Sequence, residues 1–188
     1  MNEKVKVAII GTAGRKEDAR KMSKYLFNRM VATAQEVMFT QFQLKKPEIV
    51  LVSGGSAWAD HIAVRLWLES FACPTESDFY AGLKLYLPCQ YSSTNDGIYF
   101  HDSTGATLNE LHGAFTSKIA DGFNSRKDLL CAQTLGADFD CSYHGFLNRN
   151  FQVAQSDYVV AFTWGDSDKR PKEGGTKHTW VGPQCYYD

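Results

Sequence analysis

Short apolar runs separated by longer amphipathic stretches dominate the chain. Residues 5–11 read Val-Lys-Val-Ala-Ile-Ile-Gly, residues 48–53 read Glu-Ile-Val-Leu-Val-Ser, and similar runs occur at 83–87 and 158–164. Runs of this length that are rich in β-branched residues and end at turn-forming residues predict strands. Their almost continuous apolar character is typical of strands that are covered on both faces, as in parallel sheets.

Helical periodicity fills the stretches between these runs. Apolar residues recur at three- and four-residue steps over 16–43 and 58–71, and a shorter helix is predicted at 146–155. Strands that alternate with helices form right-handed βαβ units. We therefore expect an α/β fold of the Rossmann-like, doubly wound type, with a mainly parallel sheet and helices on both faces.

The pattern is less regular over approximately 89–145. Residues 105–120 and 124–136 are compatible with helices, although polar residues interrupt both patterns. We interpret this stretch as an insertion into a single domain that spans residues 1–188.

Charge and cysteine usage narrow the function classes. Of the 188 residues, 20 are Lys or Arg and 21 are Asp or Glu, which argues against the clustered cations of a nucleic-acid-binding surface. No apolar run is long enough to span a membrane, and a strand is expected too close to the N-terminus for a signal peptide. Five cysteines without a CxxC pair fit a reducing compartment, so we expect a cytoplasmic protein.

Other chemistries find little support in the sequence. A GxSxG nucleophile elbow is absent. Cys141 and His144 form a single CxxH pair near Cys131, without the second matched pair that structural zinc sites have. We therefore expect neither a metal nor a cofactor.

Two glycine-rich turns directly follow the first two predicted strands. They are Gly11-Thr12-Ala13-Gly14-Arg15 and Ser53-Gly54-Gly55-Ser56-Ala57-Trp58-Ala59-Asp60. Ligands of doubly wound folds bind at the carboxyl ends of the strands, where small residues let the backbone approach an anion. Asp60 either bonds a ribose hydroxyl or complements a helix dipole, and Trp58 either stacks on a base or packs onto the sheet.

Two more polar motifs occur towards the C-terminus. Asn148-Arg149-Asn150 precedes the last predicted strand, and Gly174-Gly175-Thr176 follows it. Arg149 either holds a phosphate or carboxylate or forms a surface salt bridge. Four such motifs at one sheet edge favour a binding site over turn geometry alone.

In this order the motifs resemble the SLOG superfamily of Rossmann-like nucleotide-binding proteins, which includes the lonely-guy phosphoribohydrolases and the DprA-type DNA-processing proteins. The resemblance rests on Gly11-x-x-Gly14-Arg15 with Asp18, Ser53-Gly54-Gly55-x-x-x-Ala59-Asp60, the segment 148–162, and Gly174-Gly175-Thr176-x-x-Thr179. It covers about two thirds of the chain and is closest to small stand-alone members, which are often encoded near phage or defence genes.

The resemblance implies that the chain binds a nucleotide or a nucleotide-derived ligand. In the phosphoribohydrolase branch, an Arg before the last strand and a Glu after the Gly-Thr pair support N-glycosidic cleavage. Arg149 matches the first position, but Thr179 occupies the second. Hydrolysis needs a carboxylate, for which Asp60 is the better candidate and Asp157 the poorer one.

Our first hypothesis is a nucleotide sensor or sequestering protein, in which Trp58 or Trp164 stacks on the base. The second is a nucleotide N-glycosidase with Arg149 and Asp60 as catalytic residues, and a DprA-like partner of nucleic acid ranks third. A homo-oligomer is expected because related folds usually dimerise. The predicted ligand-binding residues are Gly11, Thr12, Gly14, Arg15, Gly54, Gly55, Ser56, Trp58, Asp60, Asn148, Arg149, Trp164, Gly174, Gly175 and Thr176.

Aromatic residues make up 13% of the chain. Trp58, Trp164 and Trp180 each lie in or beside a predicted ligand turn. We therefore predict that at least one of these indoles faces a base.

Overall fold

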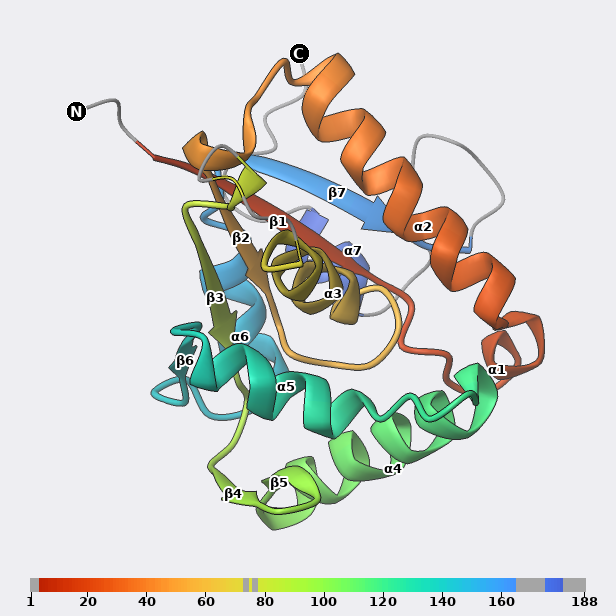
Figure 1. Ribbon diagram of the computed structural model, residues 1–188. Coiled ribbons are helices and arrows are strands. Elements are labelled where there is room, and N and C mark those ends of the chain that lie inside the picture. The colour runs from red at the N-terminus through yellow and green to blue at the C-terminus, as the bar shows by residue number, and fades with distance from the viewer. Residues whose placement is uncertain (1–3, 73–74, 76–77, 165–174, 181–188) are drawn as a thin grey trace.

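A five-stranded sheet forms the centre of the computed structural model, which describes residues 4–72, 75, 78–164 and 175–180 (Figure 1). All of its strand pairs are parallel, in the order β6-β3-β2-β1-β7. The strands are β1 (Val5–Gly11), β2 (Ile49–Ser53), β3 (Gly82–Tyr86), β6 (Asp138–Asp140) and β7 (Tyr158–Phe162). The predicted Rossmann-like α/β fold is thereby confirmed.

Helices cover both faces of this sheet. In Figure 1, α2 and α3 lie in front of the strands, and α6 and α7 lie behind them. A separate antiparallel hairpin consists of β4 (Tyr91–Thr94) and β5 (Gly97–Phe100). The helices are α1 (Asp18–Lys21), α2 (Lys24–Glu36), α3 (His61–Ser70), α4 (Asp102–Ile119), α5 (Ser125–Thr134), α6 (Phe146–Val153) and α7 (Gly175–Trp180). None of the helices in these described ranges has the length and apolar character that a bilayer crossing requires.

Alternation along the strands divides the core into two layers. Val7 and Ile9 of β1 point into a large cluster on the α2–α3 side. Ala8 and Ile10 point the other way, into a small cluster that contains Val153 of α6. Strands buried on both faces explain why the apolar runs in the sequence are nearly continuous.

The predicted helix over 16–43 is interrupted. Met22 adopts an extended conformation, and Ser23 then caps α2 by accepting a hydrogen bond from the backbone N of Leu26 at 3.2 Å. Serine is favoured at such positions because its hydroxyl bonds a backbone N–H at the helix start, whereas inside a helix the same hydroxyl competes with the backbone hydrogen bonds. The helix continues beyond Glu36 as a π-helical turn, Val37–Gln41.

The stretch 89–145 is not simply an insertion. It contains both predicted helices, and it also supplies β6, which pairs with β3 at the sheet edge. The three residues of β6 read Asp-Phe-Asp, and Lys84 of β3 neutralises the two carboxylates at 2.6 and 3.4 Å. A short charged edge strand of this kind carries no apolar run by which it could be predicted.

The strand order places a topological switch point between β1 and β7. The chain leaves β1 towards β2, β3 and β6, and it then returns through α6 to β7 on the other side of β1. Connections that leave neighbouring strands in opposite directions open a crevice at the carboxyl ends of those strands.

Candidate functional site

A cleft of about 490 Å³ lies at this switch point. The turn after β1, the start of α3, the helices α6 and α7, and the end of β7 contribute to it. Its polar lining residues are Thr12, Arg15, Lys16, Asp18, Ser56, Asp60, Arg149, Asn150, Thr163, Thr176 and Thr179. Three of the four predicted motifs, and the described part of the fourth, therefore contribute residues that line this cleft.

A buried ion pair forms one wall of the cleft. Arg149 of α6 is 7% exposed, and its Nη1 donates to Oδ2 of Asp60 at 3.0 Å. The backbone N of Ser56 donates to the same oxygen at 3.3 Å. Asp60 stands at the N-cap position of α3, so the pair joins two segments that are 89 residues apart in the sequence.

Gly54 makes room for the Arg149 guanidinium. A Cβ at position 54 would lie 0.9 Å from Nη1 of Arg149 and 2.8 Å from Oδ2 of Asp60. Gly55 has a φ of +69°, and its carbonyl accepts from Nε2 of His112 at 3.1 Å. Neither glycine lines the cleft. Gly54 thus accommodates an arginine, and a Cβ at Gly55 would meet Leu87, where the sequence suggested an open phosphate cradle.

The first glycine-rich turn is tightly packed. A Cβ at Gly11 would lie 1.9 Å from the carbonyl oxygen of Phe162, and one at Gly14 would lie 2.7 Å from Nε1 of Trp58. Oγ1 of Thr12 accepts from the backbone N of Gly14 at 3.1 Å. Gly11 and Thr12 line the cleft, whereas Gly14 lies behind it.

Two guanidiniums share one aromatic ring in the cleft. Cζ of Arg15 lies 5.0 Å from the ring centroid of Phe146, and Cζ of Arg149 lies 5.7 Å from it. Partial burial and the nearby Arg149 charge lower the pKa of Arg15, while Asp60 opposes that shift. The two arginines therefore stand close enough to repel each other, and this makes the local potential favourable for an anion.

Two buried polar atoms beside the ion pair have no hydrogen-bond partner in the structure. They are Oγ of Ser56 and Nε of Arg149. Both residues also donate to Oδ2 of Asp60, through the backbone N of Ser56 and Nη1 of Arg149, so the two unpartnered atoms are close to one carboxylate. Four other atoms of this kind lie elsewhere in the described residues, namely Nδ1 of His61, Nε1 of Trp67, Oη of Tyr80 and Nε1 of Trp164. Those of Ser56 and Arg149 are distinguished by their position beside one carboxylate, and buried groups without partners are candidates for binding a water, an ion or a ligand.

The tryptophans do not lie where the sequence suggested. Of the two roles that the sequence left open for Trp58, the structure supports packing: the indole is 2% exposed and lies against Phe27 and Phe115 in the core. Nζ of Lys21 lies 4.7 Å from the ring centroid of Trp164. Trp164 does not line the cleft. The side chain of Trp180 is outside the part of the chain that the structure describes.

Helical spacing corrects the third motif. The exposed Asn148 donates through Nδ2 to the carbonyl of His144 at 2.9 Å and does not line the cleft. Asn150 does line it, together with Phe146, Arg149 and Val153. Phe146, Arg149, Asn150 and Val153 stand at i, i+3, i+4 and i+7 of α6, which is the spacing of one helix face and could have identified them from the sequence, whereas Leu147 also lines the cleft and lies off that spacing.

The fourth motif is partly described. Gly174 is outside the described residues, and Gly175 begins α7. Thr176 and Thr179 line the cleft, and Thr179 is 4% exposed. Thr179, which stands where the resemblance to phosphoribohydrolases would lead one to expect a glutamate, thus lines this cavity.

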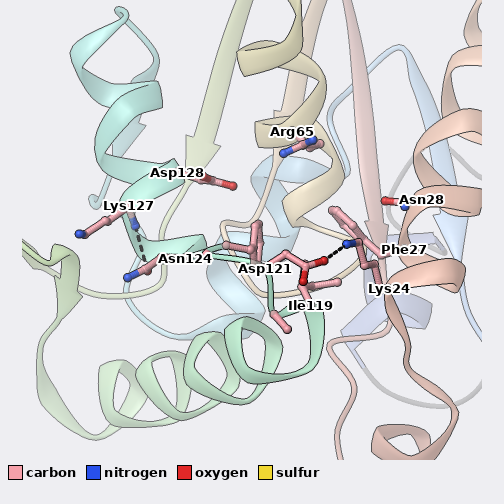
Figure 2. A pocket seen from close by; sticks show the side chains of 12 residues that line it. Lys24, Phe27, Asn28, Arg65, Ile119, Asp121, Asn124, Lys127 and Asp128 are labelled. Atoms are coloured by element: carbon pink, nitrogen blue, oxygen red, sulfur yellow. Dashed lines mark hydrogen bonds and ion pairs between the residues drawn. The ribbon is translucent and has the colours of Figure 1, made fainter.

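A second hollow, of about 390 Å³, lies among α2, α3, α4 and α5 (Figure 2). Lys24 forms an ion pair with Asp121 there, as the dashed line in Figure 2 shows. Oδ2 of Asp128 lies 3.2 Å from Nε2 of the buried His61. Nε of Arg65 donates to Oε1 of Glu69 at 2.7 Å.

Neither the cleft nor the hollow contains, in its described residues, a set of side chains suited to bind a metal ion. Within the described ranges, His, Cys, Asp and Glu side chains nowhere gather in a group of three that could hold a metal ion. Cys131 and Cys141 are free thiols, exposed and half-buried respectively.

Comparison with known proteins gives one informative relative. No family model and no solved structure matches the chain. The chain is 39% identical over 180 residues, which are 94% of its length, to a protein of Acanthamoeba polyphaga mimivirus that carries the name "Uncharacterized protein R261", and the match covers 90% of the viral protein. The chain therefore belongs to the same protein family as this mimiviral protein.

Proposed function

We propose that the protein binds a nucleotide or a nucleotide-derived phosphate in the cleft at the β1–β7 switch point, and that it acts as a sensor or sequestering protein. One observation carries the proposal: two residues that line the cleft, Ser56 and Arg149, each have a buried polar atom without a partner, Oγ and Nε respectively. A buried donor without an acceptor costs about 1–3 kcal/mol. A ligand oxygen that accepts a hydrogen bond from either atom recovers part of that energy.

Charge and position support an anionic ligand. Arg15 and Arg149 converge on Phe146, and Asp60 neutralises one of them. A guanidinium fork matches the oxygens of a phosphate better than an ammonium does. The resemblance to SLOG proteins favours a nucleotide as the carrier of that phosphate.

Calorimetric titration and thermal denaturation with AMP, inorganic phosphate and adenosine test the proposal. A ligand at one hundred times its Kd stabilises the native state by about 2.7 kcal/mol. For a domain of this size, that energy raises Tm by about 5–10 °C. We expect AMP to bind and adenosine not to bind, whereas equal behaviour of the two compounds would refute a phosphate site.

The variants must separate binding from folding. Ser56→Ala removes a hydroxyl that has no protein partner, so we expect weaker AMP binding at unchanged stability. Arg149→Met should abolish binding, with Arg65→Met as its matched control because Arg65 lines only the second hollow. The double variant Asp60→Asn/Arg149→Met removes both charges, so a loss of binding in this variant is not caused by an unpaired buried carboxylate.

The second candidate function is cleavage of the N-glycosidic bond. It is favoured by the presence of a carboxylate, that of Asp60, beside Arg149 in the same cleft. Chromatography of nucleoside monophosphates and NAD-type compounds after incubation tests it. Free base that is released by the wild type and lost in Asp60→Asn would support a hydrolase, whereas a rise in Tm without free base supports the sensor.

A further inference from the structure

We propose that His112 of α4 is a positioning residue for the cleft, although it does not line the cleft: it fixes the peptide unit between Gly55 and Ser56 and thereby sets the affinity of the cleft for an anion. This inference rests on the proposed function, because it assigns a control of affinity to the same cleft. It follows from the groups that hold the two ends of that peptide unit.

The peptide unit between Gly55 and Ser56 is held at both ends. Its carbonyl, that of Gly55, accepts from Nε2 of His112 at 3.1 Å. Its N–H, that of Ser56, donates to Oδ2 of Asp60 at 3.3 Å. The carbonyl and the N–H of a trans peptide lie in one plane and point in opposite directions. A donor that fixes the carbonyl therefore also directs the N–H of Ser56 towards Asp60.

The state of the His112 ring is defined by its surroundings. Nε2 carries the proton, because the carbonyl oxygen that it contacts only accepts hydrogen bonds. Burial and, to a smaller extent, the charge of His61 lower the pKa of His112 to about 3, so the ring is neutral at pH 7. Its Nδ1 is then an acceptor, and Oγ of the buried Ser125 lies 3.0 Å from it. A hydrogen-bonded path thus runs from the first residue of α5 through His112 to the peptide beside the cleft.

The orientation of this peptide decides which of its two dipole ends faces the cleft wall. Gly55 has a φ of +69°, in a region that glycine adopts without steric cost. Rotation of the peptide plane by half a turn would point the carbonyl oxygen at Asp60, where the N–H lies now. Backbone N–H groups attract anions, whereas a carbonyl oxygen repels them. By holding the carbonyl, His112 keeps the N–H on the side of Ser56 and Asp60, which both line the cleft.

Two amide substitutions separate the two nitrogens of His112. The side-chain nitrogen of Gln reaches about as far as Nε2 of His, whereas the amide of Asn reaches only as far as Nδ1. We expect His112→Gln to keep the affinity for AMP, measured by titration calorimetry, within about threefold of the wild type, and His112→Asn to lower it at least about tenfold. Equal affinities of His112→Asn and the wild type, or equal losses in both variants, would overturn the inference.

Met38→Ala controls for a general loss of stability. Met38 is fully buried in the turn Val37–Gln41, which precedes the amino end of β2, whereas Gly55 follows the carboxyl end of that strand. Removal of its side chain destabilises the core without touching the Gly55–Ser56 peptide. We expect this variant to unfold at a lower urea concentration and to bind AMP as the wild type does. A fall in AMP affinity as large as that of His112→Asn would overturn the inference.

The backbone amide of Ser56 provides a readout that needs no ligand. We expect its hydrogen exchange, followed by NMR, to be at least about tenfold faster in His112→Asn than in the wild type and to be unchanged in His112→Gln. Unchanged exchange in His112→Asn would refute the positioning role. If AMP does not bind to the wild type, the proposed function and the control of affinity both fail, and the exchange of this amide still decides whether His112 positions the peptide.

Discussion

The cleft at the switch point and the hollow of Figure 2 are similar in volume, about 490 and 390 Å³, and both are lined by charged side chains. They differ in how those side chains are satisfied. In the hollow, Lys24 pairs with Asp121, and Asp128 pairs with Nε2 of His61, a residue that does not itself line the hollow and whose Nδ1 is buried without a partner. In the cleft, Oγ of Ser56 and Nε of Arg149 are buried without partners.

The difference teaches that size and charge alone do not identify a binding site. Within the described residues that line the hollow, no buried polar side-chain atom lacks a hydrogen bond. A ligand that entered the hollow would compete with the Lys24–Asp121 and His61–Asp128 pairs. A ligand that enters the cleft satisfies donors that otherwise have no acceptor, and the gain in free energy differs accordingly.

The largest expected effect is on stability, through Arg149. Arg149→Met leaves the carboxylate of Asp60 buried without its charge partner, which typically costs about 3–5 kcal/mol. Arg65→Met removes an exposed ion pair in the hollow and should change stability by less than about 1 kcal/mol. Urea denaturation of both variants measures the contrast, and equal losses would contradict the distinction between the two regions.

Gly54→Ala should have the next largest effect. The new Cβ overlaps with the Arg149 guanidinium and forces it to move, and overpacking of this kind costs about 1–3 kcal/mol. AMP affinity should fall as well, because Nε of Arg149 moves with the rest of the group. Gly113→Ala is the control: nothing lies within 4 Å of its Cβ position in α4, so we expect a gain of about 0.5–1 kcal/mol.

Ser56→Ala tests the unpartnered hydroxyl with a smaller effect. We expect AMP affinity to fall about fivefold to tenfold, with the free energy of unfolding unchanged within about 0.5 kcal/mol. Ser70→Ala should show the opposite pattern, because Oγ of Ser70 donates to the carbonyl of Trp67 in the core and does not reach the cleft. Unfolding curves and calorimetry on both variants check this double dissociation.

The smallest expected effect concerns Asp121 in the hollow. Lys24 lowers the pKa of Asp121 below its ordinary value through a hydrogen bond and its charge. The unfolded carboxyl titrates near its ordinary pKa of about 3.9, so the pair contributes its stability above that pH and loses it as the pH falls through the lower folded pKa. The stability difference between wild type and Asp121→Asn should therefore shrink between pH 5 and pH 2. A constant difference would show that the ion pair does not contribute.

Burial explains which parts of the fold were predictable. The runs at β1 and β2 are apolar because these strands are covered on both faces, and β3 and β7 are partly buried and still rich in apolar residues, so the sequence pattern located all four. The edge strand β6 is held by Lys84 and by main-chain pairing, and it leaves no such pattern. Its place in the sheet depends on a partner strand that is distant in the sequence.

The sequence indicated which residues gather at the site better than it indicated what each of them does there. Arg149 and Asp60 were expected at one sheet edge, and the structure brings them into direct contact. The space that Gly54 leaves for Arg149 depends on how α6 packs beside the end of β2, and the local sequence does not encode that packing. Trp58 adopts a positive φ of +60° and turns into the core, which proximity to a glycine-rich turn could not indicate.

The position of the Arg149 guanidinium against Gly54 also affects the entropy of ligand binding. An arginine side chain that becomes fixed loses about 1.5–2 kcal/mol of rotamer freedom. In this protein Asp60, Gly54 and the ring of Phe146 already hold the side chain, so that freedom is lost when the chain folds. An arriving ligand therefore meets a preorganised guanidinium, and more of the energy of each new hydrogen bond appears as affinity.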